Sequence, residues 1–487
     1  MSAVENTIAA LRARMRVEAG EAAVAMRVVY AVVAAYAVLF VFAAVVHYEV
    51  FATQRFDLGN MVQAIWNTLH GHVLETTTLN GHQRSRLAAH VDPFLLLLAP
   101  LFWIWKSALL LLVVQVLAVA SGALPVFWLA RKHLGSARAA AHFAIAYLLY
   151  PATQFNAFTN ADGVHPVSFA VPLVLYAVWF LDEDRLLAFS VVALLAFATK
   201  EEIPLAVGCL GIWYAVRKGR RLFGLGVFAA GLGATLFNFL WVIPHFAPKG
   251  AGPFADRYAK VGGTPGGMVH KLFTDPSAFV HAVATGHKIF YLVFLLAPFL
   301  GLWALEPLLF LGAVPDLVIN VLSGKSAQTT VLFQYTAGIL PFVVAASVFG
   351  AARLQGRKPK LDLPLWALVG AAAVAVYSPI AVLPGDVRAI GSPLVAAQAH
   401  ALSLIPSQAP VSSSNRLGSH LSERRYVYTF PTVRRAKWIA VDVNDSTYLD
   451  AKGYKRVISK YEADQAWRIV YSSHGITVLH RRSTTGA

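Results

Sequence analysis

Long apolar segments that are almost free of charge constrain the fold of this chain more than any other feature. Hydrophobic residues make up 57% of its 487 residues and charged residues 14%, whereas soluble globular chains carry about 25% charged residues. Segments 27–46, 107–130 and 363–383 have about the 20 apolar residues that cross a bilayer. The chain is therefore predicted to be an all-α polytopic membrane protein.

The positions of the basic residues predict how the chain crosses the membrane, because short cytoplasmic loops carry an excess of Lys and Arg. Breaking the apolar block 289–322 at Glu306-Pro307 places all the basic turns on one side. These turns are 12–16, 131–138, 217–221 and 353–360. The expected topology is about eleven crossings of the inner (plasma) membrane, with the N-terminus in the cytoplasm.

Three regions follow from this topology. Residues 1–26 are expected to form a cytoplasmic interfacial helix, and residues 27–384 the transmembrane domain with an outer loop at 47–91. Residues 385–487 alternate short apolar strands with polar helical stretches, which is typical of a small α/β domain, here on the extracytoplasmic side. Its last two strands are expected to form a hairpin around Ser473-His474-Gly475.

Two segments are not expected to cross the membrane. Residues 93–105 are apolar but too short to span a bilayer, so they are predicted to be interfacial or re-entrant. Residues 245–287 are rich in Gly and Pro and are predicted to be a long outer loop. The glycines at 262–267 lack a flanking strand and helix, which indicates a flexible loop and not a phosphate-binding turn.

Composition also narrows the function. The net charge of +16 would suggest nucleic acid in a soluble protein, but here the basic residues mark membrane topology and offer no support for a nucleic-acid partner. Membrane lipids and a phosphate-bearing substrate fit them better. The single cysteine, Cys209, leaves neither a disulfide nor a thiol metal site. Nucleotide-driven chemistry is not expected, because Walker-type and dinucleotide-binding turns are absent.

Asp57 and Asp92 stand at the two ends of the polar, His-rich segment 56–92. A carboxylate kept at a membrane boundary is costly, so it indicates function. The structural alternative is that Asp57 is the N-cap of a helix at 58–69 and Asp92 the N-cap of a helix that begins at Pro93. The two interpretations are compatible.

Further polar groups are expected on the same side of the membrane. Asp162 and His165 precede a helix-starting Pro and could ligate a metal or act as an acid–base pair, with a capped turn as the alternative. In Lys200-Glu201-Glu202 the Lys could bind a phosphate, with a solvated helix junction as the alternative. Tyr335 lies in the first turns of the next expected span and is alternatively an interfacial anchor. Together these residues predict a polar cavity open to the outer face.

These motifs, in this order, resemble a bacterial and archaeal membrane family catalogued as domain of unknown function 2079. The resemblance covers residues 30–480, almost the whole chain. The motifs that carry it are Phe56-Asp57-Leu58-Gly59-Asn60 with Gln63 and Trp66, His90-Val91-Asp92-Pro93, Leu101 with Gln115 and Pro125, Asp162 with His165-Pro166, Lys200-Glu201-Glu202, and Gln334-Tyr335 before Pro341.

That family is distantly similar to the GT-C glycosyltransferases, so the resemblance implies a GT-C-like fold and sugar transfer from a polyprenyl-phosphate donor on the outer face. By position, Asp57 matches the acid of the first outer loop, which serves as general base or helps to hold the acceptor. Asp162 and His165 match the place where some members hold a divalent metal such as Mg²⁺ or Mn²⁺.

The chemistry of glycosyl transfer is compatible with these residues. Transfer needs a base for the incoming hydroxyl, a role for Asp57. It also needs positive charge for the departing phosphate, which Arg84, Arg86 or Lys200 could supply. The other residues expected to bind substrate are His90, Asp92, Glu201, Glu202, Gln334 and Tyr335.

Two other functions are weighed against this one. A transporter or lipid flippase would place coupling charges near the middle of the membrane, where Asp316 is the residue expected, since Glu306 falls on an inner turn. A membrane scaffold that presents the C-terminal domain would have little reason to gather carboxylates at one face. A glycosyltransferase-like membrane protein is the leading prediction.

Overall fold

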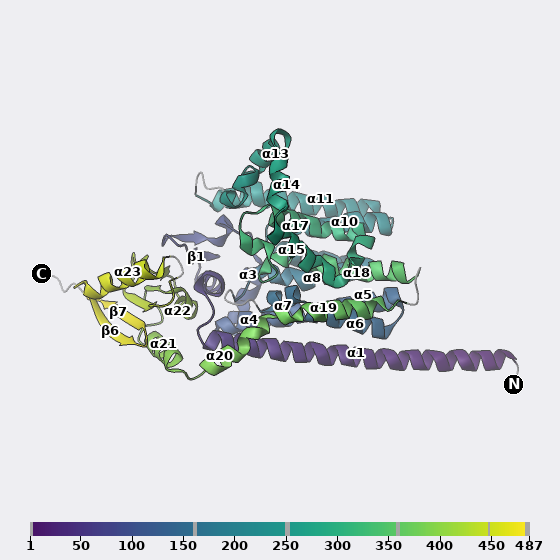
Figure 1. The fold of residues 1–487 in the computed structure, drawn as a ribbon, viewed down its shortest axis with the longest axis horizontal. Helices are drawn as coiled ribbons and strands as arrows, with labels where there is room; N and C mark the ends of the chain where they lie inside the picture. Colours follow the sequence, from purple (N-terminus) through teal and green to yellow (C-terminus); the bar gives the residue numbers. More distant parts are fainter. Residues whose placement is uncertain (1–2, 159–162, 249–253, 357–360, 447–448, 483–487) are drawn as a thin grey trace.

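The computed structural model describes residues 3–158, 163–248, 254–356, 361–446 and 449–482. Long helices lie side by side, and a small domain with a β-sheet caps one end of the bundle (Figure 1). We call this the domain end. The N-terminal end of helix α1 (Ala3–Glu49) lies at the opposite end. The architecture is thus the predicted one, a mainly helical membrane part with a C-terminal α/β domain.

The helices of the membrane part vary greatly in length. Four helical segments are long and apolar enough to cross a bilayer, namely Gly20–Glu49, Ala108–Leu134, Arg221–Phe246 and Leu363–Ala389, and a fifth candidate, Ser277–Val283 with Gly286–Phe299, bends by 64°. Shorter apolar helices are Phe94–Trp103, Ala137–Leu149, Pro166–Asp182, Leu186–Phe197, Ile203–Arg217, Pro307–Leu322 and Leu340–Gln355. The count of about eleven crossings therefore stays a prediction.

The ordered elements of the membrane part follow one another with few long connections. The α-helices after α1 are α2 (Asn60–Leu69), α3 (Phe94–Leu98), α4 (Ala108–Ser121), α5 (Ala123–Leu134), α6 (Ala137–Leu149), α7 (Pro151–Ala157), α8 (Ala170–Asp182), α9 (Leu186–Phe197), α10 (Ile203–Arg217), α11 (Arg221–Phe237), α12 (Ile243–Phe246), α13 (Pro265–Thr274), α14 (Ser277–Val283), α15 (Gly286–Leu296), α16 (Pro307–Phe310), α17 (Val314–Leu322), α18 (Leu340–Gln355), α19 (Leu363–Val374) and α20 (Leu383–Ala389).

The structure adds detail to three expected segments. The helix expected at 1–26 is described from Ala3 on, and it runs into the first span as one unbroken helix, α1. The loop expected at 245–287 contains α13 and α14, and Thr264 caps α13 through its side chain. The loop at 47–91 holds a short antiparallel hairpin, β1 (Glu75–Thr77) and β2 (Gln83–Ser85). The Gly and polar residues of the segments 47–91 and 245–287 are compatible with these turns and helix starts.

Small residues let neighbouring helices approach closely, as is common in membrane bundles. In the pair α10 and α11, a side chain at Gly211 would collide with the carbonyl oxygen of Gly224, and one at Gly231 with that of Pro204. Glycine at these sites therefore allows backbone-to-backbone packing. The buried residues on the remaining faces are mainly Ala, Val, Leu and Phe.

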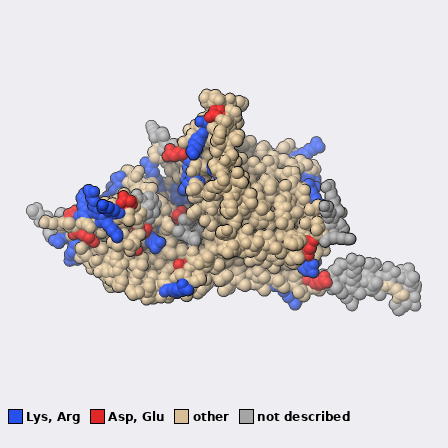
Figure 2. Space-filling view, viewed as in Figure 1, with Lys and Arg blue, Asp and Glu red and all other residues tan. Residues whose placement is uncertain are grey.

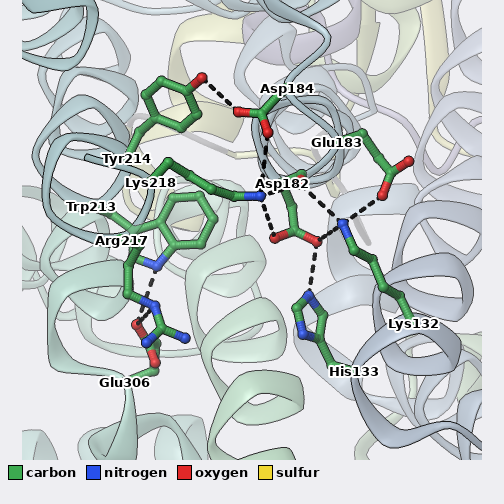
Figure 3. Close-up of polar contacts among 10 residues, drawn as sticks. All are labelled: Lys132, His133, Asp182, Glu183, Asp184, Trp213, Tyr214, Arg217, Lys218 and Glu306. Atoms are coloured by element: carbon green, nitrogen blue, oxygen red, sulfur yellow. Dashed lines mark hydrogen bonds and ion pairs between the residues drawn. The ribbon is translucent and has the colours of Figure 1, made fainter. Parts of the chain in front are cut away.

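Charged residues from the predicted inner turns gather in two clusters, one around Asp182 and one around Glu306 (Figure 3). The carboxylate of Asp182, 4% exposed, contacts Lys132 Nζ at 2.7 Å and His133 Nε2 at 2.8 Å. Lys218 Nζ donates to the backbone oxygen of Asp182 at 2.7 Å. These contacts join the ends of α5, α8 and α10, so a buried charge here is compensated by several partners.

Glu306 is the acid at the centre of the second cluster. Its carboxylate, 1% exposed, accepts from Trp213 Nε1 at 3.1 Å and lies 2.6 Å from Arg353 and 3.7 Å from Arg217 Nε. The break expected at Glu306-Pro307 is present, since α16 starts at Pro307. Glu306 thus lies with the basic ends of α10 and α18, as the predicted topology requires.

The C-terminal domain is built on a five-stranded sheet in the order β4-β3-β5-β7-β6. Strands β3, β4 and β5 are parallel, and β5, β7 and β6 are antiparallel. The expected hairpin is present as β6 and β7. The elements are α21 (Pro393–Ser403), β3 (Val411–Ser413), α22 (Asn415–His420), β4 (Val427–Thr429), β5 (Trp438–Asp442), α23 (Ala451–Ala463), β6 (Trp467–Ser473) and β7 (Ile476–Arg481).

Charged residues are distributed unevenly over the surface. Figure 2 shows Lys and Arg gathered on the C-terminal domain and toward the opposite end, with a broad, mainly uncharged area over the helices between them. Exposed apolar side chains on the helices include Leu187, Leu194, Leu222 and Leu240. An apolar area of this kind is expected where helices face lipid.

Candidate functional site

A polar cavity lies at the domain end of the helical bundle and has a volume of about 750 Å³. The first loop, its β1–β2 hairpin and the segments before α8, before α10 and before α18 all contribute to its walls. We call it the polar cavity. The titratable side chains that line it are Asp57, Arg84, Arg86, His90, Asp92, His165, Lys200, Arg257, Lys325 and Tyr335.

Asp57 lies in a π-helical turn, η1 (Arg55–Gly59), directly before α2. The N-cap of α2 is Gly59, so the expectation that Asp57 caps this helix is wrong. A π-turn of this kind is common at functional sites. The Asp57 side chain is 28% exposed at the cavity, which leaves its carboxylate accessible to a ligand.

His165 faces Asp57 from the start of the α8 segment. Its Nε2 atom lies 3.6 Å from Asp57 Oδ1, which is beyond hydrogen-bond distance. Nε2 is buried and has no hydrogen-bond partner among the described residues. Burial, together with the positive charges of Arg86, His90 and Lys200, lowers the pKa of His165 to about 3. His165 is therefore neutral at physiological pH and presents a nitrogen to the cavity.

Gly163 makes this close approach possible. It has φ of +89°, and a Cβ atom there would lie 2.5 Å from Leu58 Cβ. Only glycine fits such a position without strain. The segment that carries His165 can therefore pack directly onto the turn that carries Asp57.

Arg86 and Asp92 form a buried bidentate ion pair in the first loop. Arg86 Nε donates to both carboxylate oxygens, at 3.2 and 3.1 Å, and its terminal nitrogen donates to Oδ2. The side chains are 10% and 3% exposed. Asp92 was expected to cap a helix at Pro93, but α3 has no side-chain cap. Arg86 engages its carboxylate instead.

Lys200, Glu201 and Glu202 form the turn between α9 and α10. Lys200 lines the cavity and pairs with Glu202. Burial lowers the pKa of Lys200, but the nearby carboxylates raise it more, so its pKa lies above the usual range. Glu201 accepts from the Val91 backbone at 2.9 Å and contacts His90 Nδ1 at 3.1 Å. Both glutamates are about 5% exposed. The alternative of a solvated helix junction is thus wrong.

Arg84, Arg257 and Lys325 supply positive charge that no acid in the described part of the chain neutralises. Their side chains form no hydrogen bond or ion pair with the described residues, although the Arg257 guanidinium lies 4.1 Å from the Phe254 ring centroid. The Gly324 amide donates to the Arg257 backbone oxygen at 2.6 Å, which links the segments that carry Arg257 and Lys325. Positive charge of this kind is available to a ligand.

Arg257 and Lys325 are not among the site residues predicted from the sequence. Nothing in the local sequence of Lys325 separates it from a solvated lysine. Arg257 lies in a Gly-rich segment that was expected to be a loop. The nearest signal was the placement of both segments on the outer side, which permits contact but does not specify it.

Gln334 and Tyr335 both line the cavity from the short turn η11 (Gln334–Thr336). They precede α18, so the expectation that Tyr335 lies in the first turns of this span is wrong. Lys200 Nζ lies 5.9 Å from the Tyr335 ring centroid, within the range of a cation–π contact. Tyr335 therefore belongs to the cavity wall.

The structure brings most of the predicted site residues to one place. Glu201 and Glu202 lie behind the wall, where they hold His90, Val91 and Lys200. Asp162 lies outside the described residues. The predicted residues that line the cavity are Asp57, Arg84, Arg86, His90, Asp92, His165, Lys200, Gln334 and Tyr335.

A divalent metal would find two adjacent ligands here, Asp57 and His165. The described residues contain no cluster of three or more His, Cys, Asp or Glu suited to a metal. Mg²⁺ is usually bound through one or two protein carboxylates, with substrate phosphates and water completing its shell. The unpartnered, buried Nε2 of His165 beside a carboxylate fits such an arrangement, with Asp92 excluded because Arg86 engages it.

Comparison with known proteins adds the family and the fold. A family model described as "Predicted membrane protein (DUF2079)" matches residues 47–478. The chain belongs to this family. The family resemblance inferred from the motifs is therefore confirmed. A search of curated proteins finds no match.

Two crystal structures of ArnT from Cupriavidus metallidurans resemble the whole chain. The apo structure has 13% sequence identity and a TM-score of 0.51, and the structure bound to undecaprenyl phosphate has 14% and 0.50. Each alignment covers 92% of this chain and 98% of ArnT. The DUF2079 protein thus shares the ArnT fold, which agrees with the expected GT-C-like architecture.

Proposed function

We propose that this DUF2079 protein is an integral membrane glycosyltransferase that transfers a sugar from a polyprenyl-phosphate donor, with catalysis in the polar cavity. The observation that carries the proposal is the composition of this cavity. An accessible carboxylate, Asp57, lines the same cavity as Arg84, Arg257 and Lys325, three cations that no acid among the described residues pairs with. A base and a phosphate-binding surface are the two elements that this reaction needs.

The fold gives independent support. The chain aligns with ArnT over nearly its full length, and one ArnT structure holds undecaprenyl phosphate. Fold alone does not fix function, so the argument rests on the cavity residues. The polar cavity lies at one end of the bundle, beside the C-terminal domain, where a lipid-linked phosphate at headgroup depth could enter it.

Asp57 is assigned as the general base. The acceptor hydroxyl loses its proton to the Asp57 carboxylate as its oxygen forms a bond to the anomeric carbon. The bond from this carbon to the phosphate oxygen breaks, and polyprenyl phosphate leaves with the electron pair. His165 Nε2 lies 3.6 Å from Asp57 Oδ1, and because His165 is neutral it places no positive charge beside the carboxylate.

The leaving phosphate is assigned to Arg84, Arg257 and Lys325. Hydrogen bonds from Arg or Lys to phosphate are shorter and stronger than neutral ones, and these side chains have no competing partner among the described residues. Arg86 and Lys200 add positive charge but are already paired. In the alternative in which Asp57 and His165 hold a divalent ion, the Asp57 carboxylate is a ligand and not the base, and the ion would stabilise charge at the phosphate.

The test is a transfer assay with radiolabelled sugars in membranes. It uses a panel of polyprenyl-phosphate sugars and compares the wild type with Asp57→Asn. We expect transfer from one donor and a loss of at least 100-fold in the variant, the scale of a lost general base. Asp464→Asn, an exposed carboxylate of the C-terminal domain that caps a turn, is the matched control and should retain full activity.

A different result would point to the transporter or flippase. Asp316, the acid that favoured transport, is 5% exposed and lies within the electrostatic field of Lys200 and Glu202. It therefore lies near Lys200 and Glu202, although it does not line the polar cavity. Full activity in Asp57→Asn would refute the role of Asp57 as general base. Lipid flipping without any sugar transfer would refute the proposed glycosyltransferase activity.

A further inference from the structure

The turn that carries Asp57 is held from outside the membrane part by a short helix of the C-terminal domain. Helix α22 packs directly against η1, although the two are separated by more than 350 residues of sequence. Gly418 marks the closest approach. A Cβ atom there would lie 2.9 Å from Cβ and Cδ of Arg55, so the turn and the helix fit without space for a side chain.

Asn415 provides the specific hydrogen bonds of this contact. Its Oδ1 accepts from the Phe56 backbone amide at 3.2 Å, and its Nδ2 donates to Gln54 Oε1 at 2.7 Å. Asn415 is 2% exposed. Phe56 directly precedes Asp57, and both Gln54 and Phe56 line the polar cavity. A single buried amide of the C-terminal domain thus binds the turn on the N-terminal side of Asp57.

Two further contacts hold the same turn. Ser419 Oγ lies 3.0 Å from Thr53 Oγ1 and donates to the Thr53 backbone oxygen at 3.3 Å. Arg55, fully buried, donates to Thr429 Oγ1 and to the Thr77 backbone oxygen, each at 2.6 Å. Arg55 therefore joins the turn, the β1–β2 hairpin and the C-terminal sheet in one set of buried polar contacts.

We propose that the C-terminal domain positions the Asp57 turn for catalysis and that Asn415 is the positioning residue. The inference rests on the proposed function. A base must lie within hydrogen-bond reach of its proton, and a misplacement of about 1 Å can cost 100-fold in rate. Helix α22 adds buried hydrogen bonds and close packing to the contacts that this turn makes with α2 and with Gly163, so it fixes the turn from a further side.

Attachment of the domain alone does not require these contacts. Arg434 Nε donates to the Asn80 backbone oxygen at 2.6 Å, and Thr432 Oγ1 donates to the Leu79 oxygen at 3.1 Å. These bonds tie the domain to the tip of the β1–β2 hairpin and do not touch the Asp57 turn. They allow a control that loosens the same interface at another point.

The test compares Asn415→Ala with Arg434→Gln in the full-length protein. We expect Asn415→Ala to lower kcat about 10- to 100-fold and to leave KM for the lipid donor within about twofold, because the phosphate-binding residues are untouched. Arg434→Gln should keep kcat. Asn415→Asp retains an acceptor for the Phe56 amide, and the Gln54 amide can turn to donate to it, so this variant should recover most of the activity.

Hydrogen–deuterium exchange gives a second readout that does not depend on activity. In Asn415→Ala we expect faster exchange in residues 53–60 and unchanged exchange in residues 75–85. Arg434→Gln should show the reverse. Unchanged exchange in 53–60, or an equal loss of kcat in both variants, would overturn the proposal. If no donor supports transfer in the wild type, the proposed function fails while the exchange comparison still decides whether α22 holds the turn.

Discussion

Arg84 and Arg86 lie two residues apart, line the same cavity and were equal candidates for binding phosphate, yet the structure gives them different roles. Arg86 forms a bidentate pair with Asp92, whereas Arg84 forms no side-chain hydrogen bond or ion pair with the described residues. We predict that Arg84→Gln weakens binding of the lipid donor and that Arg86→Gln destabilises the protein. One substitution type at two nearby sites thus separates the two roles.

The expected magnitudes follow from burial. Removing Arg86 leaves the Asp92 carboxylate, 3% exposed, without its partner, and breaking a buried pair in this way costs about 3–5 kcal/mol. Removing Arg84 costs one hydrogen bond to a charged group, about 1.5–3 kcal/mol. That corresponds to a roughly 10- to 150-fold rise in the dissociation constant. Because Arg84 is half-buried, the lower end of this range is expected.

The assay measures polyprenyl-phosphate binding in nanodiscs and thermal unfolding of the same preparations. Arg84→Gln should bind at least about tenfold more weakly at an unchanged Tm. Arg86→Gln should lower Tm or the yield of folded protein. Equal Tm values for both variants, with equal losses of affinity, would refute the division into a paired and an available arginine.

Two further predictions concern a metal and pH. If Asp57 and His165 hold a divalent ion, EDTA should lower transfer at least about tenfold and added Mg²⁺ or Mn²⁺ should restore it, because the ion would stabilise charge at the phosphate; indifference to EDTA would remove the metal. Burial lowers the pKa of His420 from 6.5 to about 3, so the folded state excludes a proton that the unfolded state binds below pH 6.5. The free energy of unfolding is therefore unaffected by His420 above pH 6.5. Below that pH, proton binding to His420 in the unfolded state lowers it by about 1.4 kcal/mol per pH unit. The Tm of the wild type should therefore drop more steeply than that of His420→Phe between pH 6.5 and pH 4, and parallel curves would contradict this.

The general location of the site could be predicted from the sequence for a physical reason. Apolar spans fix which loops share a side of the membrane, and a charge at a membrane boundary needs a function or a partner. Asp57, His165, Lys200 and Tyr335 come from four separate loops, and the alternation of spans alone places them at one face. The structure brings all four to the polar cavity.

The pairing within that site could not be predicted in the same way. Side-chain partners depend on distances of a few ångströms, whereas topology specifies only a side of the membrane. The ion pair between Arg86 and Asp92 occupies both side chains. Arg86 is therefore less suited to bind phosphate than predicted, and Asp92 does not cap a helix. Arg257 and Lys325 lie together in the site, where the Gly324 amide donates to the Arg257 backbone oxygen. No residue pattern predicts this hydrogen bond.

The contact between Asn415 and the Asp57 turn could not be predicted from the sequence either. Composition separates the C-terminal domain from the membrane part, and this separation favours treating the domain as independent of the chemistry. Yet its helix α22 meets the turn so closely that Gly418 and Gly59 leave no space for a Cβ atom. Buried amide hydrogen bonds of this kind are costly to leave unmade, so domain and turn must adopt one relative position. The domain that looks most separable in the sequence therefore contributes directly to the geometry of the candidate base.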